Sequence, residues 1–539
     1  MKPCNVVDPP HMESGPDTPW TMTNVAEAMP GVQTVLGWTF WRDACERAVR
    51  ENFRRLGALR RGELAVPESP DDRFSAVFYG RAAGNVRLFR EMGDRLPGTS
   101  GDAVEEQLFG VKRSATASSP RWERYPVVAA KMPVAAVRSA RRIKALRAET
   151  DRWWRSTVEA PPATLAAASA LLREASRRFE EIMGWHCLVT MLGQGLYEQV
   201  TKLAVGAGLT DQALDLVSGY GATEEVCILE DLWALSQGQL TEALFLSRHG
   251  YHGPDEGELS GRTWREDPSP LRSLIAAYAD LSADRRPAAI EASRQARRLE
   301  AVAKLMAALP ASRWAVARLL LAASGRYLPL REVGKAAFLQ TIDAARLAAR
   351  VAGRLLAADG VITDPEDVFH ITLDELSADG VPPAAVINER RGARERYLAV
   401  ELPGAWVGTP IVTDAAEVQP PIPGHEGDGE GDGRITGIGA SSGLAEGVAR
   451  VVTDSVVSDD FEVGDVLVCH TTDPGWASIM FLAGALVVDV GGPMSHAAIV
   501  ARELGVPCVV NTGDGTRRVR SGERLRVDGT AGLVERVGG

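Results

Sequence analysis

The sequence predicts a multidomain protein in which a mainly helical α+β part is followed by a smaller C-terminal α/β domain. Residues 127–250 are rich in Ala, Leu and Arg, and their apolar residues recur at helical spacing. Residues 418–433, VQPPIPGHEGDGEGDG, have the composition of a flexible linker. From residue 434 onward, short apolar runs separated by turn residues indicate strands. A chain of 539 residues can form two to four such domains.

Composition and charge exclude several classes of function. A hydrophobic content of 45% and a charged content of 24% are typical of a globular protein in water. The net charge of −11 argues against a nucleic-acid or anionic-membrane partner. There is neither a long apolar run nor an apolar signal core at the N-terminus, so we expect a cytoplasmic protein. The six cysteines form no C-x-x-C pair, and we expect no zinc site or disulfide framework.

The first part of the chain begins with a Pro-rich polar segment, residues 1–19, which we expect to be disordered. Phe74–Tyr79 is predicted to form a strand, and Val86–Leu96 either a strand or a helix. Two long helices are expected around Ala135–Thr157 and Thr164–Ala207. In the C-terminal domain, strands are predicted at Ala449–Val452, Val466–Cys469, Ala485–Val490, Val509–Val510 and Arg524–Val527.

The stretch VVDVGGPMSHAAIVARELGVPCVV, residues 487–510, carries the main candidate for chemistry. An apolar run leads into Gly491-Gly492, and Ser495 has the residue type of an N-cap before a short amphipathic helix. Gly505 is a predicted helix stop. His496 therefore lies in the first turn of a helix, where free N–H groups and the helix dipole favour anions. An imidazole in this place can carry or contact a phosphoryl group.

The pattern GG-x-x-SHAAI-x-AR-x-x-G-x-P resembles the swivelling phosphohistidine domain of phosphoenolpyruvate-utilising enzymes, which include phosphoenolpyruvate synthase, pyruvate phosphate dikinase and rifampin phosphotransferase. In that family the His of SHAA shuttles a phosphoryl group between an ATP-grasp domain and a substrate domain. The resemblance implies that residues 434–539 form the mobile domain and that His496 is its catalytic residue. Gly491, Gly492, Ser495 and Arg502 would support it. A flexible linker before such a domain suits a shuttling role.

A second candidate is a pair of cations, Arg331 and Lys335, placed four residues apart on one face of a predicted helix. Glu332 is expected to face elsewhere, so the pair would repel unless an anion or solvent compensates it. The surrounding R-E-x-x-K pattern also resembles the rifampin phosphotransferases. The resemblance implies that Arg331 clamps the transferring phosphoryl group and that Lys335 neutralises developing charge or orients the acceptor hydroxyl.

Two further stretches resemble the substrate-binding domain of rifampin phosphotransferases. The resemblance implies that this domain covers residues 20–417. TMTNVAEAMPGVQTVLGWTFW contains Gln33 and Thr34, which either contact substrate or make cap and turn bonds. FLSRHGYHGPDEGELSGRTWREDP contributes His252, Glu256 and Glu258 as pocket residues or as residues that fix the loop. Its His-x-x-His spacing also raises a metal site, but a Gly/Pro loop does not hold both rings on one face. We predict no metal.

The family's ATP-grasp region and a G-x-x-x-x-G-K-[ST] loop are both missing from this sequence. We therefore expect no cofactor bound by this chain, with ATP and magnesium entering only through a separate ATP-grasp partner. Three functions remain open. The first is phosphoryl transfer from His496 to a hydroxyl of a small, hydrophobic natural product. The second is an ATP-independent dehydratase or lyase in which His496 is the general acid or base. The third is a non-catalytic protein that binds an apolar metabolite.

Overall fold

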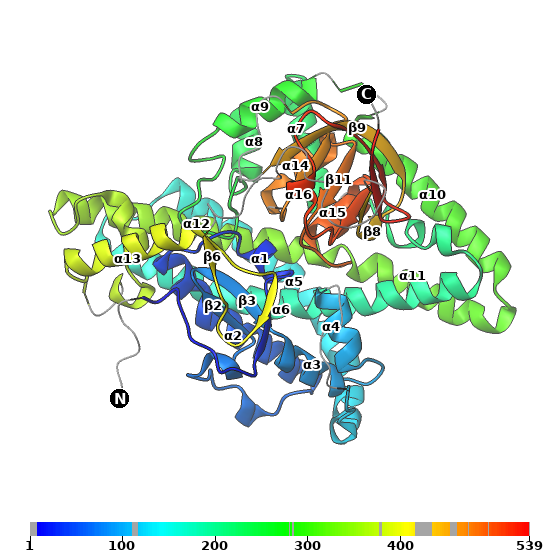
Figure 1. The fold of residues 1–539 in the computed structure, drawn as a ribbon, viewed down its shortest axis with the longest axis horizontal. Helices are drawn as coiled ribbons and strands as arrows, with labels where there is room; N and C mark the ends of the chain where they lie inside the picture. Colours follow the sequence, from blue (N-terminus) through cyan, green and yellow to red (C-terminus); the bar gives the residue numbers. More distant parts are fainter. Residues whose placement is uncertain are drawn as a thin grey trace.

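The computed structural model describes a helical body and a C-terminal α/β domain (Figure 1). The residues that it describes are 8–109, 117–221, 223–279, 281–282, 285–376, 380–414, 434–452, 461–472, 474–493 and 495–537. The predicted linker, residues 418–433, lies outside these ranges. No helix in the described part of the chain combines the length and the apolar character needed to cross a membrane.

A small antiparallel sheet stands at the beginning of the chain. Its strand order is β2-β3-β1-β5, and its strands are β1 (Pro19–Thr21), β2 (Ser75–Phe78), β3 (Arg81–Asn85) and β5 (Ala405–Val407). The predicted strand at residues 74–79 is confirmed by β2. We expected residues 8–18 to be disordered, but they are ordered because they bond to residues beside the sheet. The Ser14 hydroxyl donates to Asp71 at 2.6 Å, and Gly408 donates its N–H to Thr18 O.

Four long helices form the body of the helical part. They are α2 (Val35–Leu56), α5 (Tyr125–Glu159), α6 (Leu165–Gly206) and α12 (Leu330–Ala358). Alanine and leucine at helical spacing let α12 lie in the centre of the bundle, where most of its residues are buried. The two long helices predicted from the sequence are α5 and α6, and the side chain of Thr164 caps α6.

Nine other helices of the described residues, of which α10 is as long as α2, complete this part of the chain. They are α1 (Val25–Ala28), α3 (Val86–Asp94), α4 (Gly101–Phe109), α7 (Glu224–Ser236), α8 (Glu242–His249), α9 (Ser269–Ala279), α10 (Pro287–Ala308), α11 (Trp314–Tyr327) and α13 (Ala384–Leu398). Residues 86–96, for which strand and helix were both open, form α3. Asn85 decides for the helix, because its side chain accepts the N–H of Leu88 and so caps the first turn.

The C-terminal domain is built on one eight-stranded sheet, in the order β7-β14-β13-β9-β10-β11-β12-β8. Its strands are β7 (Ile435–Thr436), β8 (Ile438–Ser441), β9 (Leu444–Val452), β10 (Val466–Cys469), β11 (Ala485–Val488), β12 (Cys508–Val510), β13 (Arg524–Asp528) and β14 (Leu533–Arg536). The central strands β9 to β12 are parallel. The helices are α14 (Ala477–Leu482), α15 (His496–Leu504) and α16 (Gly515–Arg518). All five predicted strands are present.

The C-terminal domain is seated on α7, α8 and α9 (Figure 1). Apolar residues of those helices and of the C-terminal domain form one buried cluster, which includes Leu229, Leu232, Met480 and Ala498. Tyr278 of α9 crosses the interface and donates its hydroxyl to Ser478 O at 3.0 Å. The structure thus holds the C-terminal domain docked against the helical part, and α15 faces inward.

Candidate active site

His496 is the first residue of α15, as the sequence predicts. The Ser495 hydroxyl accepts the N–H of Ala498 at 3.2 Å, and Gly505 ends the helix with a left-handed backbone, φ 69°. Gly491 and Gly492 form the preceding loop. Ser495 N–H donates to Gly492 O at 3.0 Å, and a Cβ on Gly491 would lie 3.1 Å from Ser495 Oγ. The two glycines and Ser495 therefore shape the turn that delivers His496.

The imidazole of His496 is buried in the interface between the two parts, with 5% of its surface exposed. Nδ1 lies 3.5 Å from Thr472 Oγ1, and Nε2 has no hydrogen-bond partner among the described residues. Burial, followed by the charges of Lys335 and Arg331, holds the pKa of His496 well below its usual value. The ring is therefore neutral at physiological pH, with an unshared electron pair free to act.

Arg331 and Lys335 both lie near His496, but the prediction that they lack acidic partners is wrong. Arg331 Nη1 bonds Glu332 Oε1 at 2.7 Å, so Glu332 does not face elsewhere. Lys335 Nζ lies 2.8 Å from Glu225 Oε1 and 3.8 Å from Glu256 Oε2. The carboxylates of Glu225 and Glu256 come from α7 and from the loop after α8, so a helical pattern within residues 331–335 could not reveal them.

Buried carboxyl groups surround the basic pair. Burial and the charges of Glu503 and Glu225 raise the pKa of Glu332 well above its usual value. Burial also raises the pKa of Glu503, on α15. Glu225 behaves differently: although burial opposes ionisation, Lys335 and other nearby positive charge lower its pKa to about 2. The docked site therefore combines an ionised pair, Glu225 and Lys335, with carboxyl groups that hold protons more tightly than usual.

Glu27, at the N-terminal side of the site, contacts α15 directly. Its Oε2 accepts the backbone N–H of His496 at 2.6 Å, and its Oε1 is buried without a partner in the described structure. Burial raises the pKa of Glu27 to about 7, although the N–H of His496 and the charge of Arg331 oppose that shift. A carboxyl group of the helical part thus occupies the helix end that we expected to be free for an anion.

His252 and Glu256 belong to the same polar network. Glu256 Oε1 lies 2.5 Å from His252 Nδ1, and the other carboxylate oxygen faces Lys335. His252 Nε2 is buried without a partner in the described part of the protein. His249 instead pairs with Asp231 at 2.7 Å. His249 and His252 therefore bond to different carboxylates. Among the described residues, no group of three or more His, Cys, Asp and Glu side chains is placed to hold a metal ion.

Gln33, Thr34 and Glu258 do not join this network in the structure. Thr34 caps α2 and donates its hydroxyl to Glu258 Oε1 at 2.6 Å. Glu258 also accepts the N–H groups of Thr34 and Ser260, and Gln33 Nε2 donates to Pro30 O. These bonds fix a loop to the start of α2. The structure thus shows cap and turn bonds for Gln33 and Thr34 and loop-fixing bonds for Glu258, and substrate contact by these residues stays a prediction.

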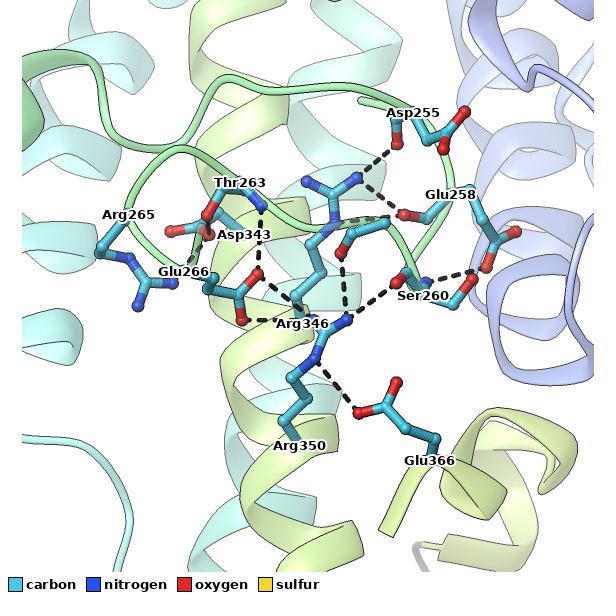
Figure 2. Close-up of polar contacts among 11 residues, drawn as sticks. Asp255, Glu258, Ser260, Thr263, Arg265, Glu266, Asp343, Arg346, Arg350 and Glu366 are labelled. Carbon is cyan, nitrogen blue, oxygen red and sulfur yellow. Dashed lines mark hydrogen bonds and ion pairs between the residues drawn. The ribbon is translucent and has the colours of Figure 1, made fainter. Parts of the chain in front are cut away.

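Two arginines of α12 hold the loop that carries His252 and Glu256 (Figure 2). The buried guanidinium of Arg346 donates to the carbonyl oxygens of Asp255, Glu256 and Glu258 at 2.6–3.1 Å. Arg350 donates to Ser260 O at 2.8 Å and pairs with Glu266. The hydrogen bonds to several buried carbonyl oxygens compensate the cost of burying the charged guanidinium group. The loop is therefore a rigid part of the site.

We expect Arg346→Met to destabilise the protein, because the loop carbonyls lose their donor while they stay buried. The free energy of unfolding should fall by about 3 kcal/mol, which corresponds to one or two charged hydrogen bonds left unmade. Urea denaturation measures this quantity. Arg354→Met, at an exposed position of the same helix, is the matched control and should change stability by less than about 0.5 kcal/mol. Equal stability of the two variants would contradict the role of Arg346.

A small cavity of about 90 Å³ lies between α6, α10, α15 and the start of α12. Its walls include the rings of Tyr197, Tyr220 and Tyr327 and the charged residues Arg331 and Glu503. Arg502, also in the wall, donates to Ala440 O at 2.6 Å and lies over the Tyr197 ring. Ile499 and Glu503 line the pocket at three and seven residues after His496, on the same face of α15.

Sequence reasoning missed three carboxyl groups of this site, Glu27, Glu225 and Glu503, and it wrongly expected the fourth, Glu332, to face elsewhere. Glu27 stands in the N-x-x-E-x-x-P-G stretch, so its position could have been noticed, but nothing in the stretch indicates a contact with residue 496. Glu225 and Glu503 look like ordinary residues at the start and near the end of amphipathic helices. Only the docking of the C-terminal domain brings the four together.

Two segments of the chain match known protein families. Residues 461–532 match the PEP-utilising enzyme, mobile domain, and residues 223–332 match the rifampicin phosphotransferase fourth domain. The first segment contains His496, and the second contains Glu225, His252, Glu256 and Arg331. The resemblance found in the sequence is therefore confirmed for these segments.

Similar proteins share parts of this chain. It is 37% identical to an uncharacterised phosphotransferase, YvkC, of Bacillus subtilis over 34% of its own length and 22% of that protein. It is 36% identical to a rifampicin phosphotransferase of Streptomyces sviceus over 33% of its length and 20% of that protein. A phosphoenolpyruvate synthase of Aeropyrum pernix is 45% identical over 22% of this chain and 15% of the synthase. The chain thus matches a fifth or so of the length of these relatives.

Proposed function

We propose that this chain, in which residues 461–532 belong to the PEP-utilising mobile domains and residues 223–332 to the rifampicin phosphotransferase fourth domains, is a His-dependent phosphotransferase. His496 accepts a phosphoryl group and passes it to a hydroxyl of a small, mainly apolar acceptor. The observation that carries the proposal is the buried, neutral His496 ring, whose Nε2 is unpaired in the described structure beside Arg331 and Lys335.

The residues present suit the transfer step. A neutral imidazole is a nucleophile for phosphorus. Its low pKa also makes it a good leaving group in the second step, when the phosphorus–nitrogen bond is cleaved. Phosphoryl transfer requires positioning and compensation of charge spread over the transferring oxygens. Arg331, which is only partly covered, would contact those oxygens. Lys335 is fixed between Glu225 and Glu256, so we expect it to act as a local positive charge rather than as a mobile ligand.

The acceptor would occupy the pocket beside α15. Its three tyrosine rings favour a flat or apolar molecule, and Arg331 at its edge marks the end nearest the transferring group. His496 is not among the residues that line the pocket, but it lies on the same face of α15 as Ile499 and Glu503, which do. The docked cavity is smaller than a hydroxylated hydrophobic natural product, so an acceptor of this kind would bind when the mobile domain moves away from the helical part, and the pocket's polar edge would orient its hydroxyl group.

The phosphoryl donor is ATP in this proposal, bound with magnesium by an ATP-grasp unit that we expect to be a separate partner. For loading, the mobile domain would leave the docked position seen here and present His496 to that unit. The helical part would then receive the loaded domain in the docked position. Two docking places for one domain are what a phosphoryl carrier requires.

Labelling of the purified protein tests the proposal. The protein is incubated with γ-labelled ATP, alone and with candidate ATP-grasp proteins, and separately with phosphoramidate, which phosphorylates accessible imidazoles without an enzyme. We expect an acid-labile, base-stable phosphoryl group, mapped by peptide mass spectrometry to His496. Loading by ATP should require the partner. Failure of both donors to label His496 would refute phosphoryl carriage.

A second function, acid–base elimination at a hydroxylated molecule, is favoured by one specific observation. Three carboxyl groups with raised pKa values, Glu27, Glu332 and Glu503, lie around His496, and a phosphoryl group adds negative charge to such a site. In a dehydratase or lyase, the neutral His496 ring would act as the general base that removes a proton from the substrate, one of these protonated carboxyl groups would donate a proton to the leaving hydroxyl, and Arg331 and Lys335 would stabilise an oxyanion. Turnover of a hydroxylated substrate without any nucleotide, lost in His496→Ala, would establish this second function.

A further inference from the structure

We propose that Glu27 makes the docked position of the mobile domain dependent on pH and fixes the start of α15, and thereby places His496 opposite Arg331 and Lys335. The inference rests on the proposed function only in treating His496 as the reacting residue, because docking itself can be measured without any phosphoryl group. Glu27 is a positioning residue in this role, and it acts through the backbone of α15.

The contact of Glu27 is specific to the docked arrangement. Its carboxyl group comes from α1, near the N-terminus, and reaches the N–H of His496, the first residue of α15, at 2.6 Å. The first N–H groups of a helix lack intrahelical acceptors, and an acidic side chain there satisfies one of them and interacts with the helix dipole. When the domain leaves, this N–H returns to water and Glu27 loses its partner.

The helical part holds Glu27 firmly. Its helix, α1, packs against the loop around Gly257, where a Cβ would lie only 2.1 Å from Ala28 O. The indole of Trp41 donates to Gly257 O at 2.9 Å. Arg346 holds both neighbours of Gly257, Glu256 and Glu258, by their carbonyl oxygens (Figure 2). A continuous set of contacts therefore runs from α12 through the loop to α1, so that Glu27 is presented to α15 by a rigid support.

The surroundings of Glu27 make this contact dependent on pH. The groups that act on its carboxyl are His496 and Ser495 at the start of α15 and Arg331 on α12. The thiols of Cys469 on β10 and Cys508 on β12 also interact with it. In the docked state the pKa of Glu27 is raised to about 7. A group whose pKa is raised by docking stabilises docking below its free pKa, and that stabilisation is lost as the pH rises through the docked value. Docking should therefore weaken between pH 6 and pH 8.

Amide hydrogen exchange of residues 495–504 in the full chain tests the inference, with protection factors compared at pH 6 and pH 8. In the wild type, we expect protection to fall about tenfold over this interval. At pH 6 docking is accompanied by protonation of Glu27, and at pH 8 it no longer gains from that protonation. Glu27→Gln keeps an oxygen that can accept the N–H of His496 but does not titrate. We expect Glu27→Gln to show no such fall and to be more protected than the wild type at both pH values, by a factor that is about tenfold larger at pH 8 than at pH 6. Glu27→Ala should lose about fivefold protection at pH 6, the effect of a missing cap.

Glu13→Gln, an exposed change in the same N-terminal segment, is the matched control and should behave as the wild type. Unchanged exchange within α5 and α6 shows that a variant is folded. If Glu27→Ala does not fold, Glu27→Gln alone tests the inference. A fall in its protection between pH 6 and pH 8 as large as that of the wild type would overturn the inference. Phosphoramidate labelling of His496 is measured in the same samples. If His496 is labelled normally but the Glu27 variants exchange like the wild type, the role of Glu27 is refuted and phosphoryl carriage is not. If the Glu27 variants exchange differently but His496 is not labelled, phosphoryl carriage is refuted and the role of Glu27 is not.

Discussion

Replacement of His496 by alanine or glutamine is expected to abolish phosphoryl loading. Nε2 of this ring is the unpaired, buried nitrogen of the docked site, and neither replacement offers an equivalent nucleophile. Labelling at residues 495–504 should fall by about 10³-fold or more, the scale on which removal of a covalent nucleophile acts. The measurement is the label recovered in that peptide after incubation with phosphoramidate, or with ATP and a competent partner.

His470→Ala is the control for this prediction, because His470 belongs to the same domain but is exposed, 3.7 Å from Asp489. It should label as the wild type does. The fold should tolerate the loss of the His496 ring, whose one hydrogen bond among the described residues is a long one, to Thr472. Stability within about 1 kcal/mol of the wild type is therefore expected for His496→Gln. Full labelling of His496→Gln would show that another residue carries the phosphoryl group.

Replacement of Lys335 by methionine is expected to cause the largest loss of stability. Lys335 is buried, and it pairs with Glu225 at 2.8 Å and faces Glu256 at 3.8 Å. Removing one partner of a buried ion pair leaves an uncompensated charge and costs about 3–5 kcal/mol. Urea denaturation followed by tryptophan fluorescence should show this decrease in the free energy of unfolding. Lys304→Met, which removes an exposed pair with Glu300, should cost no more than about 0.5 kcal/mol.

A double-mutant cycle sharpens the prediction. Glu225→Gln alone should also destabilise, and the double variant should lose less than the sum of the two single losses, because each single change leaves its partner unpaired. Since the pKa of Glu225 is lowered to about 2 by its positively charged surroundings despite burial, its share of stability is present above its ordinary pKa near 4.5. That share should disappear as the pH falls from about 4.5 towards 2. Additive losses would show that the pair is not coupled.

The local elements of this protein follow from local patterns. Ser495, the apolar spacing after His496 and Gly505 define α15 without any knowledge of the fold, because caps and helical periodicity act within a few residues. Thr164 and the alanine-rich stretch after it define α6 in the same way. The strand β10 coincides with its predicted residues because a short, fully apolar run between turns has few alternatives. Where two patterns competed, as in residues 86–96, a single cap decided for the helix.

The sequence by itself determined the long helices α5 and α6, the helix α15, five of the eight strands of the C-terminal sheet, and His496, Arg331 and Lys335 as candidates for chemistry. Only the tertiary structure decided their partners. Glu27 and Glu225 reach the site from separate helices, and Glu258 and Thr34 bind each other instead of facing it. The physical reason is range: helix caps and apolar periodicity act between neighbours in the chain. The charge balance of a buried site instead depends on groups that meet only after folding and docking, when water no longer screens them.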